Sequence, residues 1–129
     1  MIKLGENNMK KFLIALLLLV PAHSFAAGPY DGIWAIFPYG YFTISERDNV
    51  LILVTLVTDD EDGGWAAYQG PRTGNTARLE TIYGNAKVII DTTFESDTTS
   101  RGTIVSCEPN PGYYCAFPVG TILNASKVW

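Results

Sequence analysis

The sequence contains few of the residues that most enzymes use for proton transfer. Its 129 residues include one histidine, His23, and two cysteines, Cys107 and Cys115, and only 17% of the side chains are charged. General acid and base catalysis most often uses histidine, and serine or cysteine nucleophiles need a neighbouring base. Because the sole imidazole lies near the start of the chain, we expect a protein that is not an enzyme and that carries no cofactor.

The N-terminal segment has the features of a secretory signal peptide. Two lysines precede an apolar run over residues 12–22, and small side chains follow at Ser24 and Ala26. The run is too short to span a membrane as a helix, which takes about 20 apolar residues. We predict that residues 1–26 are removed during Sec-dependent export from a bacterial cytoplasm. Residues 27–129 would then form a single domain, without a stable membrane span, in the periplasm or outside the cell.

The predicted mature chain is acidic, with twelve acidic and six basic side chains after residue 26. Nucleic acids and anionic lipid surfaces are bound through cationic side chains, so neither is an expected partner. The acidic side chains cluster once, at Asp59, Asp60, Glu61 and Asp62. Calcium binds several oxygen ligands on a loop, but consecutive acids cannot all face one ion and the spacing of a dedicated calcium loop is absent. Asp59, Asp60 and Asp62 are therefore weak metal candidates, and we favour a solvated hairpin loop here.

The two cysteines flank a short segment rich in turn residues, Glu108-Pro-Asn-Pro-Gly-Tyr-Tyr114. In an oxidising compartment two such cysteines pair. A closed loop of this length stabilises a fold by roughly 2.5 kcal/mol in the chain-entropy treatment. We predict one disulfide, between Cys107 and Cys115, that staples a hairpin.

The pattern of β-branched and aromatic residues predicts an all-β fold. After residue 27 these residues are interrupted at short intervals by Gly, Pro, Asn and Asp, which is typical of a sandwich or a barrel. Short connections favour antiparallel neighbours. We predict a small antiparallel meander of about eight strands that closes into a barrel, because closure removes free edges, and a β-sandwich is the alternative. The predicted strands cover residues 32–37, 41–46, 50–57, 65–70, 76–83, 86–94, 101–107, 113–117 and 121–128.

The segment from Val50 to Val57 is apolar at positions that face both sides of a strand. Such a strand must be covered on both faces, or it exposes an apolar patch to a partner. As a free edge it would promote aggregation, so we place it centrally. It supports one functional hypothesis: a structural or assembly subunit that forms a homo-oligomer, or joins an envelope or extracellular complex, through strand 50–57.

Aromatic residues near the predicted turns support a second hypothesis, a secreted or periplasmic binding protein. Tyr and Trp rings line sites for small molecules, peptides and glycans, although the same rings also fill small cores. A third hypothesis, a hydrolase with two carboxylates, has the candidates Glu80 with Asp91 or Asp31 with Glu46, none at a distinctive spacing. The candidate ligand-binding residues are Tyr39, Tyr41, Trp65, Tyr68, Tyr113 and Tyr114.

Gly32-Ile33-Trp34 at the first predicted strand, Trp65-Ala-Ala-Tyr-Gln-Gly70 and Gly74-Asn75 together resemble the layout of avidins and lipocalins. Those families also begin with a Gly-x-Trp strand. The resemblance implies a closed meander barrel whose mouth or interior holds a ligand, or whose outer surface mediates oligomerisation. The polar residues that hold biotin in avidins have no counterpart here, so no ligand is implied. The chain also looks like small secreted proteins of Gram-negative bacteria, a likeness that implies no activity.

Overall fold

A computed structural model describes residues 27–57 and 64–129 of the chain. The predicted leader over residues 1–26 and the acidic cluster at 59–62 lie outside these ranges. Eight strands make up the described fold: β1 (Gly32–Ile36), β2 (Gly40–Arg47), β3 (Val50–Val57), β4 (Trp65–Thr73), β5 (Thr76–Tyr83), β6 (Ala86–Phe94), β7 (Thr99–Pro109) and β8 (Ile122–Lys127).

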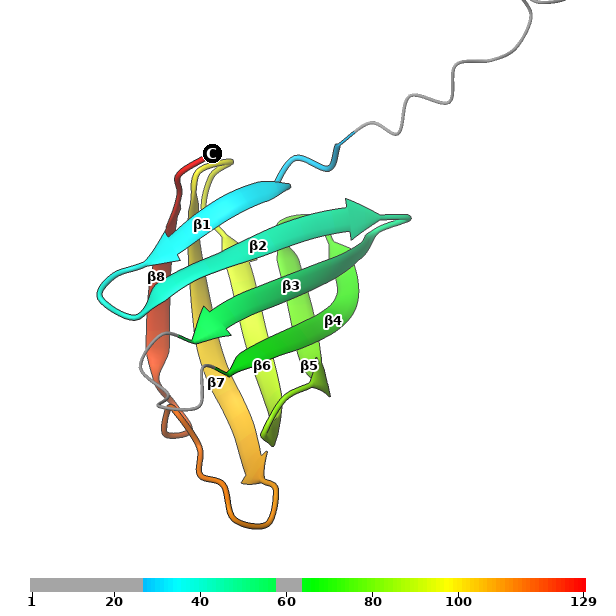
Figure 1. Ribbon diagram of the computed structural model, residues 1–129. Helices are drawn as coiled ribbons and strands as arrows, with labels where there is room; N and C mark the ends of the chain where they lie inside the picture. Colours follow the sequence, from blue (N-terminus) through cyan, green and yellow to red (C-terminus); the bar gives the residue numbers. More distant parts are fainter. Residues whose placement is uncertain (1–26, 58–63) are drawn as a thin grey trace, which may run out of the picture.

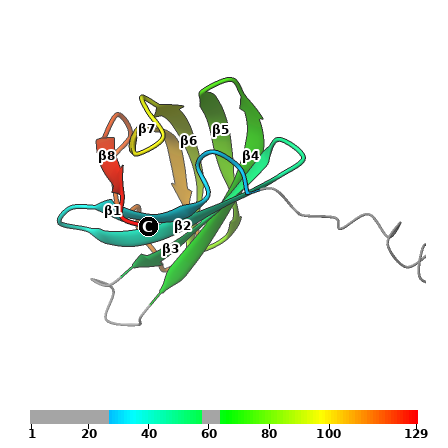
Figure 2. The same cartoon turned by 90° about the horizontal axis from the view of Figure 1, so that it is seen from above.

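The strands form one closed antiparallel barrel in chain order. Each strand pairs with its neighbours in the sequence, and β8 pairs with β1 to complete the ring. In Figure 1 the strands β1 to β4 cross in front of β5 to β8, and Figure 2 shows the two walls facing each other. The prediction of an all-β meander barrel is confirmed, and the sandwich alternative is wrong. The predicted disulfide between Cys107 and Cys115 is also present.

The prediction of a strand over residues 113–117 is wrong. These residues belong to an irregular connection over 110–121 that joins β7 to β8. Pro111 and Pro118 flank the segment, and proline has no backbone N–H to donate to a sheet. The disulfide from Cys115 to Cys107 also holds the connection against the end of β7. The aromatic residues that suggested a strand therefore lie in a loop at one end of the barrel.

The Gly32-Ile33-Trp34 segment helps to close the barrel at the end where β1 begins and the C-terminal Trp129 lies. Gly32 has a φ of 143°, and a Cβ at this position would collide with the Trp129 carbonyl oxygen. That carbonyl accepts a hydrogen bond of 2.8 Å from the backbone N–H of Ile33. The fully buried Trp34 indole donates to the Tyr30 carbonyl oxygen at 2.9 Å. The motif thus joins the C-terminus to β1 and inserts a large ring into the core.

Aromatic and aliphatic side chains fill this end of the barrel. The rings of Tyr30 and Phe94 stack with centroids 3.7 Å apart, and Trp34 meets Phe94 edge-on at 5.7 Å. These rings occupy the interior of the barrel near the start of β1. The buried core cluster consists of Tyr30, Trp34, Phe42, Ile44, Leu51, Leu53, Ala77, Leu79, Phe94 and Ala125.

Candidate functional site

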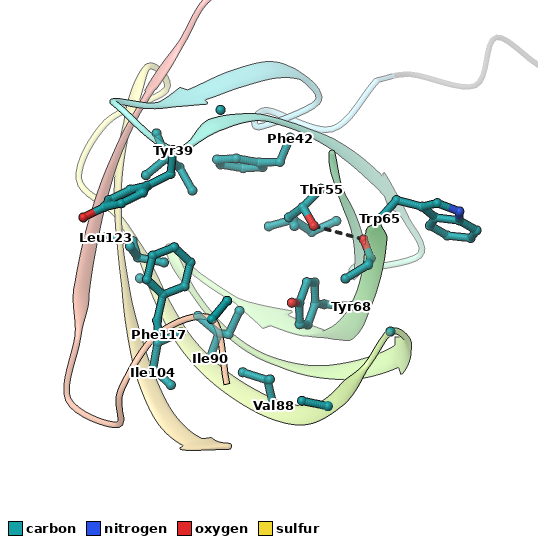
Figure 3. A pocket seen from close by; sticks show the side chains of 18 of the residues that line it. Tyr39, Phe42, Thr55, Trp65, Tyr68, Val88, Ile90, Ile104, Phe117 and Leu123 are labelled. Atoms are coloured by element: carbon teal, nitrogen blue, oxygen red, sulfur yellow. Dashed lines mark hydrogen bonds between the residues drawn. The ribbon is translucent and has the colours of Figure 1, made fainter. Parts of the chain in front are cut away.

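A cavity of about 390 Å³ lies inside the barrel, toward the end opposite the start of β1 and Trp129. Its rim is formed by the turn between β1 and β2, by Gly84–Asn85 between β5 and β6, and by the connection over 110–121. Ligand pockets in proteins commonly have volumes of about 300–1,000 Å³. Of the described residues that line this cavity, none has a charged side chain. Inward-facing aliphatic side chains form much of the wall, among them Val88, Ile90, Ile104 and Leu123 (Figure 3).

Two aromatic rings cover part of the mouth. Phe117 comes from the connection over 110–121, and Tyr39 comes from the turn between β1 and β2. Their ring centroids are 5.0 Å apart and their planes are inclined by 80°. Figure 3 shows Phe117 above Ile90 and Ile104, inside the ring of strands. The disulfide at Cys115 lies two residues before Phe117, so it restrains the segment that carries this ring.

The structure places all six predicted ligand-binding residues along the cavity, although not all of their rings face it. Tyr39 lies in the turn between β1 and β2, and Tyr113 and Tyr114 lie in the connection that follows β7. Tyr68 projects inward from β4 (Figure 3). These four tyrosines are therefore positioned to contact a molecule in the cavity or at its mouth.

Trp65 and Tyr41 reach the rim mainly through their backbones. The Trp65 indole points away from the cavity in Figure 3 and stacks on Tyr83 with centroids 4.0 Å apart. Tyr41 alternates along β2 with the buried Phe42, and its side chain is 57% exposed. Successive side chains of a strand face opposite sides of a sheet, so the Tyr41 ring lies on the outside of the barrel.

The Tyr68 phenol is a neutral hydrogen-bonding group in this cavity. Burial raises the pKa of Tyr68, because removal from water disfavours the phenolate. Its hydroxyl makes no hydrogen bond to any other residue in the described part of the chain. It therefore remains available, as a donor or an acceptor, to a bound molecule or to water.

The lining residues that were not predicted include Phe117, Thr92 and Ser100. Thr92 is 7% exposed and Ser100 is 6% exposed, and the two lie on the inward faces of β6 and β7. Short hydroxyl side chains are ordinary in strands and give no functional signal in a sequence. Burial alternates along β6 so that Thr92 shares the inward face with Phe94, but this alternation does not by itself indicate a binding site.

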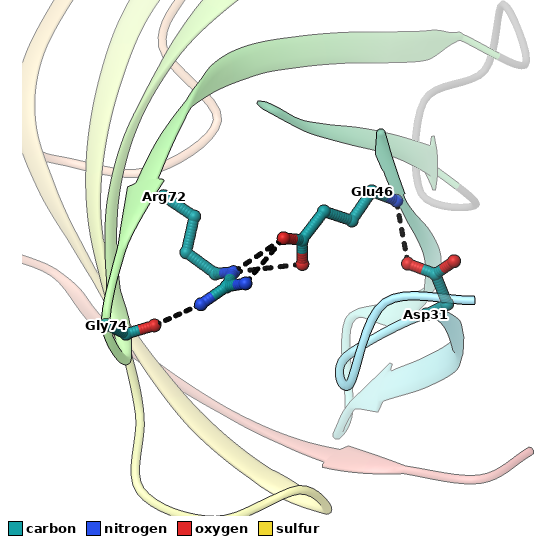
Figure 4. Close-up of polar contacts among 4 residues, drawn as sticks. All are labelled: Asp31, Glu46, Arg72 and Gly74. Carbon is teal, nitrogen blue, oxygen red and sulfur yellow. Dashed lines mark hydrogen bonds and ion pairs between the residues drawn. The ribbon is translucent and has the colours of Figure 1, made fainter. Parts of the chain in front are cut away.

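The opposite end of the barrel contains an enclosed ion pair (Figure 4). Arg72 Nη2 lies 2.6 Å from Glu46 Oε1, and Arg72 Nε donates to both Glu46 oxygens at 2.9 Å. The hydrogen bonds to Glu46 raise the pKa of Arg72. Asp31 Oδ1 accepts a hydrogen bond of 2.7 Å from the backbone N–H of Glu46. These contacts tie β2, β4 and the segment before β1 together, so this cluster supports the closed end.

None of the four carboxylates suggested for a hydrolase lines the cavity. Asp31 and Glu46 belong to the closed end, and Asp91 forms an exposed ion pair with Arg78 at 2.7 Å. Within residues 27–57 and 64–129, no group of three or more His, Cys, Asp or Glu side chains could hold a metal ion. The metal candidates Asp59, Asp60 and Asp62 are outside those ranges, so this prediction stays untested.

Two further results complete the description of the chain. No helix in the described part of the molecule is long and apolar enough to cross a membrane. Comparisons with protein-family models, curated proteins and solved structures found no match to this chain. The resemblance to avidins and lipocalins therefore stays a prediction, and the geometry of the barrel is the basis for the functional argument.

Proposed function

We propose that the chain is an exported, non-enzymatic binding protein that holds a small molecule inside its barrel. The observation that carries this proposal is the cavity of about 390 Å³ behind the Tyr39 and Phe117 rings, whose described lining residues are uncharged and largely apolar. A cavity whose walls are strands of a closed sheet is formed before the ligand arrives. Such preorganisation reduces the entropy that binding costs.

The shape of the site favours a small molecule over a peptide or a glycan. Extended peptides often bind by adding a strand to a free sheet edge, and this barrel is closed on all sides by paired strands. A glycan presents many hydroxyl groups, whereas aliphatic and aromatic side chains dominate the described wall. A compact, mostly apolar molecule would bury its surface here with few polar groups of its own left unpaired.

Filling the cavity tests the proposal. Val88 is half-buried and points into the cavity, so Val88→Trp adds volume where the ligand would lie. Thr93→Trp places the same ring on the exposed face of the same strand and serves as the matched control. The probe is N-phenylnaphthylamine, a neutral aromatic compound whose fluorescence rises in apolar surroundings.

We expect the unmodified protein and Thr93→Trp to bind the probe with similar affinity. Val88→Trp should bind it at least about tenfold more weakly, a loss that corresponds to about 1.4 kcal/mol. Near-ultraviolet circular dichroism would show whether each variant retains its packed fold. The proposal is overturned if the unmodified protein does not bind the probe, or if a folded Val88→Trp binds it as well as the control does.

A second candidate function, assembly through strand β3, is favoured by the outer surface of β1 to β3. Leu51 and Leu53 are buried, but Ile52 is 40% exposed and Val54 is 36% exposed. Of the two alternatives for this strand, coverage on both faces or an exposed apolar patch, the second fits these exposures. Ile33 lies in the same row as Val54, because Thr43 pairs with both. We propose that this face could join copies of the chain.

A further inference from the structure

We propose that the ligand is an uncharged molecule with an apolar body and one hydrogen-bonding head group, and that the head group binds Thr92 and Ser100 at the inner end of the cavity. This inference rests on the proposed function, because it identifies the chemistry of the molecule that the cavity would hold. It assigns an orientation as well: the head group enters first and the apolar body extends toward Tyr39 and Phe117.

Thr92 and Ser100 lie close together on adjacent strands. Thr92 of β6 pairs with Gly102 of β7, and Phe94 pairs with Ser100, so Thr92 and Ser100 are diagonal neighbours on one face. Residues in this relation lie roughly 7–8 Å apart, and one polar group between them could contact both hydroxyls. Both residues line the cavity, and they are the two buried polar residues of the described barrel.

Gly102 adds no side chain beside Thr92. It lines the cavity, and a Cβ at this position would lie 3.9 Å from Thr92 Oγ1 and only 3.3 Å from Ile90 Cγ2. A larger residue at this inward position would crowd Ile90 and cover the Thr92 hydroxyl. The inner end of the cavity therefore combines two hydroxyl groups with a residue that leaves the Thr92 hydroxyl uncovered.

The two hydroxyls have no protein partner. Neither Thr92 nor Ser100 makes a side-chain hydrogen bond to another residue in the described ranges. In the described ranges, no side-chain nitrogen or oxygen atom is both fully buried and without a hydrogen bond. The two unpaired hydroxyls therefore keep some accessible surface, and we place that surface in the cavity that both residues line. A hydroxyl removed from bulk water is costly without a partner. At 7% and 6% exposure, these two groups have less access to solvent than Tyr68, which lies nearer the mouth, and a ligand head group would satisfy them.

The described lining residues favour a head group that carries no charge. An ionised carboxylate or amine needs an opposite charge when it leaves water, and no described lining residue supplies one. Hydroxyl groups donate and accept hydrogen bonds, so an alcohol, a carbonyl or an amide can each pair with Thr92 or Ser100. The site therefore suits a neutral compound and disfavours a fatty acid anion.

Three eight-carbon probes separate these possibilities: octanol, octanoate and octane, each measured by displacement of N-phenylnaphthylamine at neutral pH. The variants are Ser100→Ala, and Thr92→Val combined with Ser100→Ala, which remove the hydroxyls with little change in shape. Thr93→Val, on the outer face of β6, is the matched control. Near-ultraviolet circular dichroism confirms folding, and the single variant provides the test if the double variant does not fold.

We expect the unmodified protein to bind octanol at least about tenfold more tightly than octanoate. One lost hydrogen bond between neutral groups corresponds to roughly a fivefold to tenfold change in affinity, so the double variant should bind octanol about tenfold more weakly. The affinity for octane should change less than twofold, and Thr93→Val should match the unmodified protein for every probe.

The outcomes separate this inference from the proposed function. Octanoate binding as tightly as octanol, or equal loss of octanol and octane in the variants, overturns the assignment of the head group. Octanol affinity that is insensitive to both variants overturns it as well, while continued binding of octane and N-phenylnaphthylamine leaves the proposed function standing. Failure of the unmodified protein to bind any of these compounds overturns both.

Discussion

The ion pair between Glu46 and Arg72 differs from the other ion pairs because its side chains are enclosed. Glu46 is 6% exposed and Arg72 is 17% exposed at the side chain. Removing one partner of an enclosed pair leaves an unpaired charge, which costs a fold about 3 kcal/mol or more. We expect Arg72→Met to lower the free energy of unfolding by about 3 kcal/mol, measured by urea denaturation.

The double variant Arg72→Met with Glu46→Met supplies the control, because it removes both charges and leaves apolar side chains in their place. Replacing an enclosed pair by apolar residues is often neutral. The double variant should therefore be more stable than Arg72→Met alone. Equal stability of the two variants would mean that the Glu46 carboxylate reaches water when Arg72 is absent, and the argument from enclosure would fail.

The exposed pair of Arg78 and Asp91 should behave differently. Their side chains are 57% and 48% exposed, so the pair contributes little to stability. The hydrogen bonds from Arg78 lower the pKa of Asp91. A carboxyl group with a lowered pKa stabilises the fold at pH values above the ordinary pKa of that group. This stabilisation is lost as the pH falls through the lowered pKa. In Arg78→Met the pKa of Asp91 should rise toward its ordinary value, as an NMR titration of the carboxyl carbon would show, while stability at neutral pH changes little.

Among the structural elements, the connection over 110–121 combines the disulfide with residues of the mouth. Replacing Cys107 and Cys115 by serine removes the constraint that the disulfide places on the unfolded chain. A nine-residue closed loop corresponds to roughly 2.5 kcal/mol, so the free energy of unfolding in urea should fall by about that amount. The barrel strands do not need this bond for their pairing, so the far-ultraviolet circular dichroism should stay the same.

The same variant tests whether the connection holds the ligand in place. Without the disulfide, the segment that carries Phe117 is no longer fixed to β7, and the ring can leave its contact with Tyr39 more often. N-phenylnaphthylamine should therefore dissociate faster from the serine variant in a stopped-flow experiment. An unchanged dissociation rate in a folded variant would show that Phe117 does not control exit from the cavity.

Most strands could be predicted from local patterns in the sequence, because residue types and turn signals within a short segment identify a strand. Buried Ala77 and Leu79 alternate with exposed neighbours on β5, and Asp48–Asn49 forms the short turn between β2 and β3 with positive φ at both residues. The end of β4 was predicted too early, because Pro71 is a signal for a turn. In the barrel Pro71 pairs with Val50 of β3, and Gly70 lies so near the Arg78 carbonyl that a Cβ would collide with it.

The inner end of the candidate site could not be predicted in the same way, because it exists only after the barrel closes. Tyr39, Tyr113 and Tyr114 at the mouth could be chosen as candidate binding residues because they lie near predicted turns. The exposure of Thr92 and Ser100 to an internal cavity depends on the register of β6 against β7 and on the missing side chain at Gly102. No residue pattern along a single strand contains that information.

At the scale of the whole molecule, the two ends of the barrel have different roles. One end contains the C-terminus, the stacked rings and the ion pair of Glu46 and Arg72, all of which support the fold. The other end has irregular connections around the cavity. Binding residues in many proteins lie on loops that a rigid scaffold positions, and this division follows that arrangement. Variants at the mouth should therefore affect binding more than stability.

The second candidate function, assembly through β3, can be tested by changing exposed residues on the outer surface of the barrel. Assembly through β3 predicts that residues 27–129 associate at micromolar concentration in sedimentation velocity experiments. The variant Ile52→Thr with Val54→Thr keeps β-branched side chains and makes the patch polar, so it should sediment as a monomer. The matched control is Val105→Thr with Ile122→Thr, which makes equivalent changes at exposed positions of β7 and β8 and should behave like the unmodified protein. If the unmodified protein is already a monomer, the exposed Ile52 and Val54 do not mediate self-association, and the binding function becomes the only one that the barrel supports.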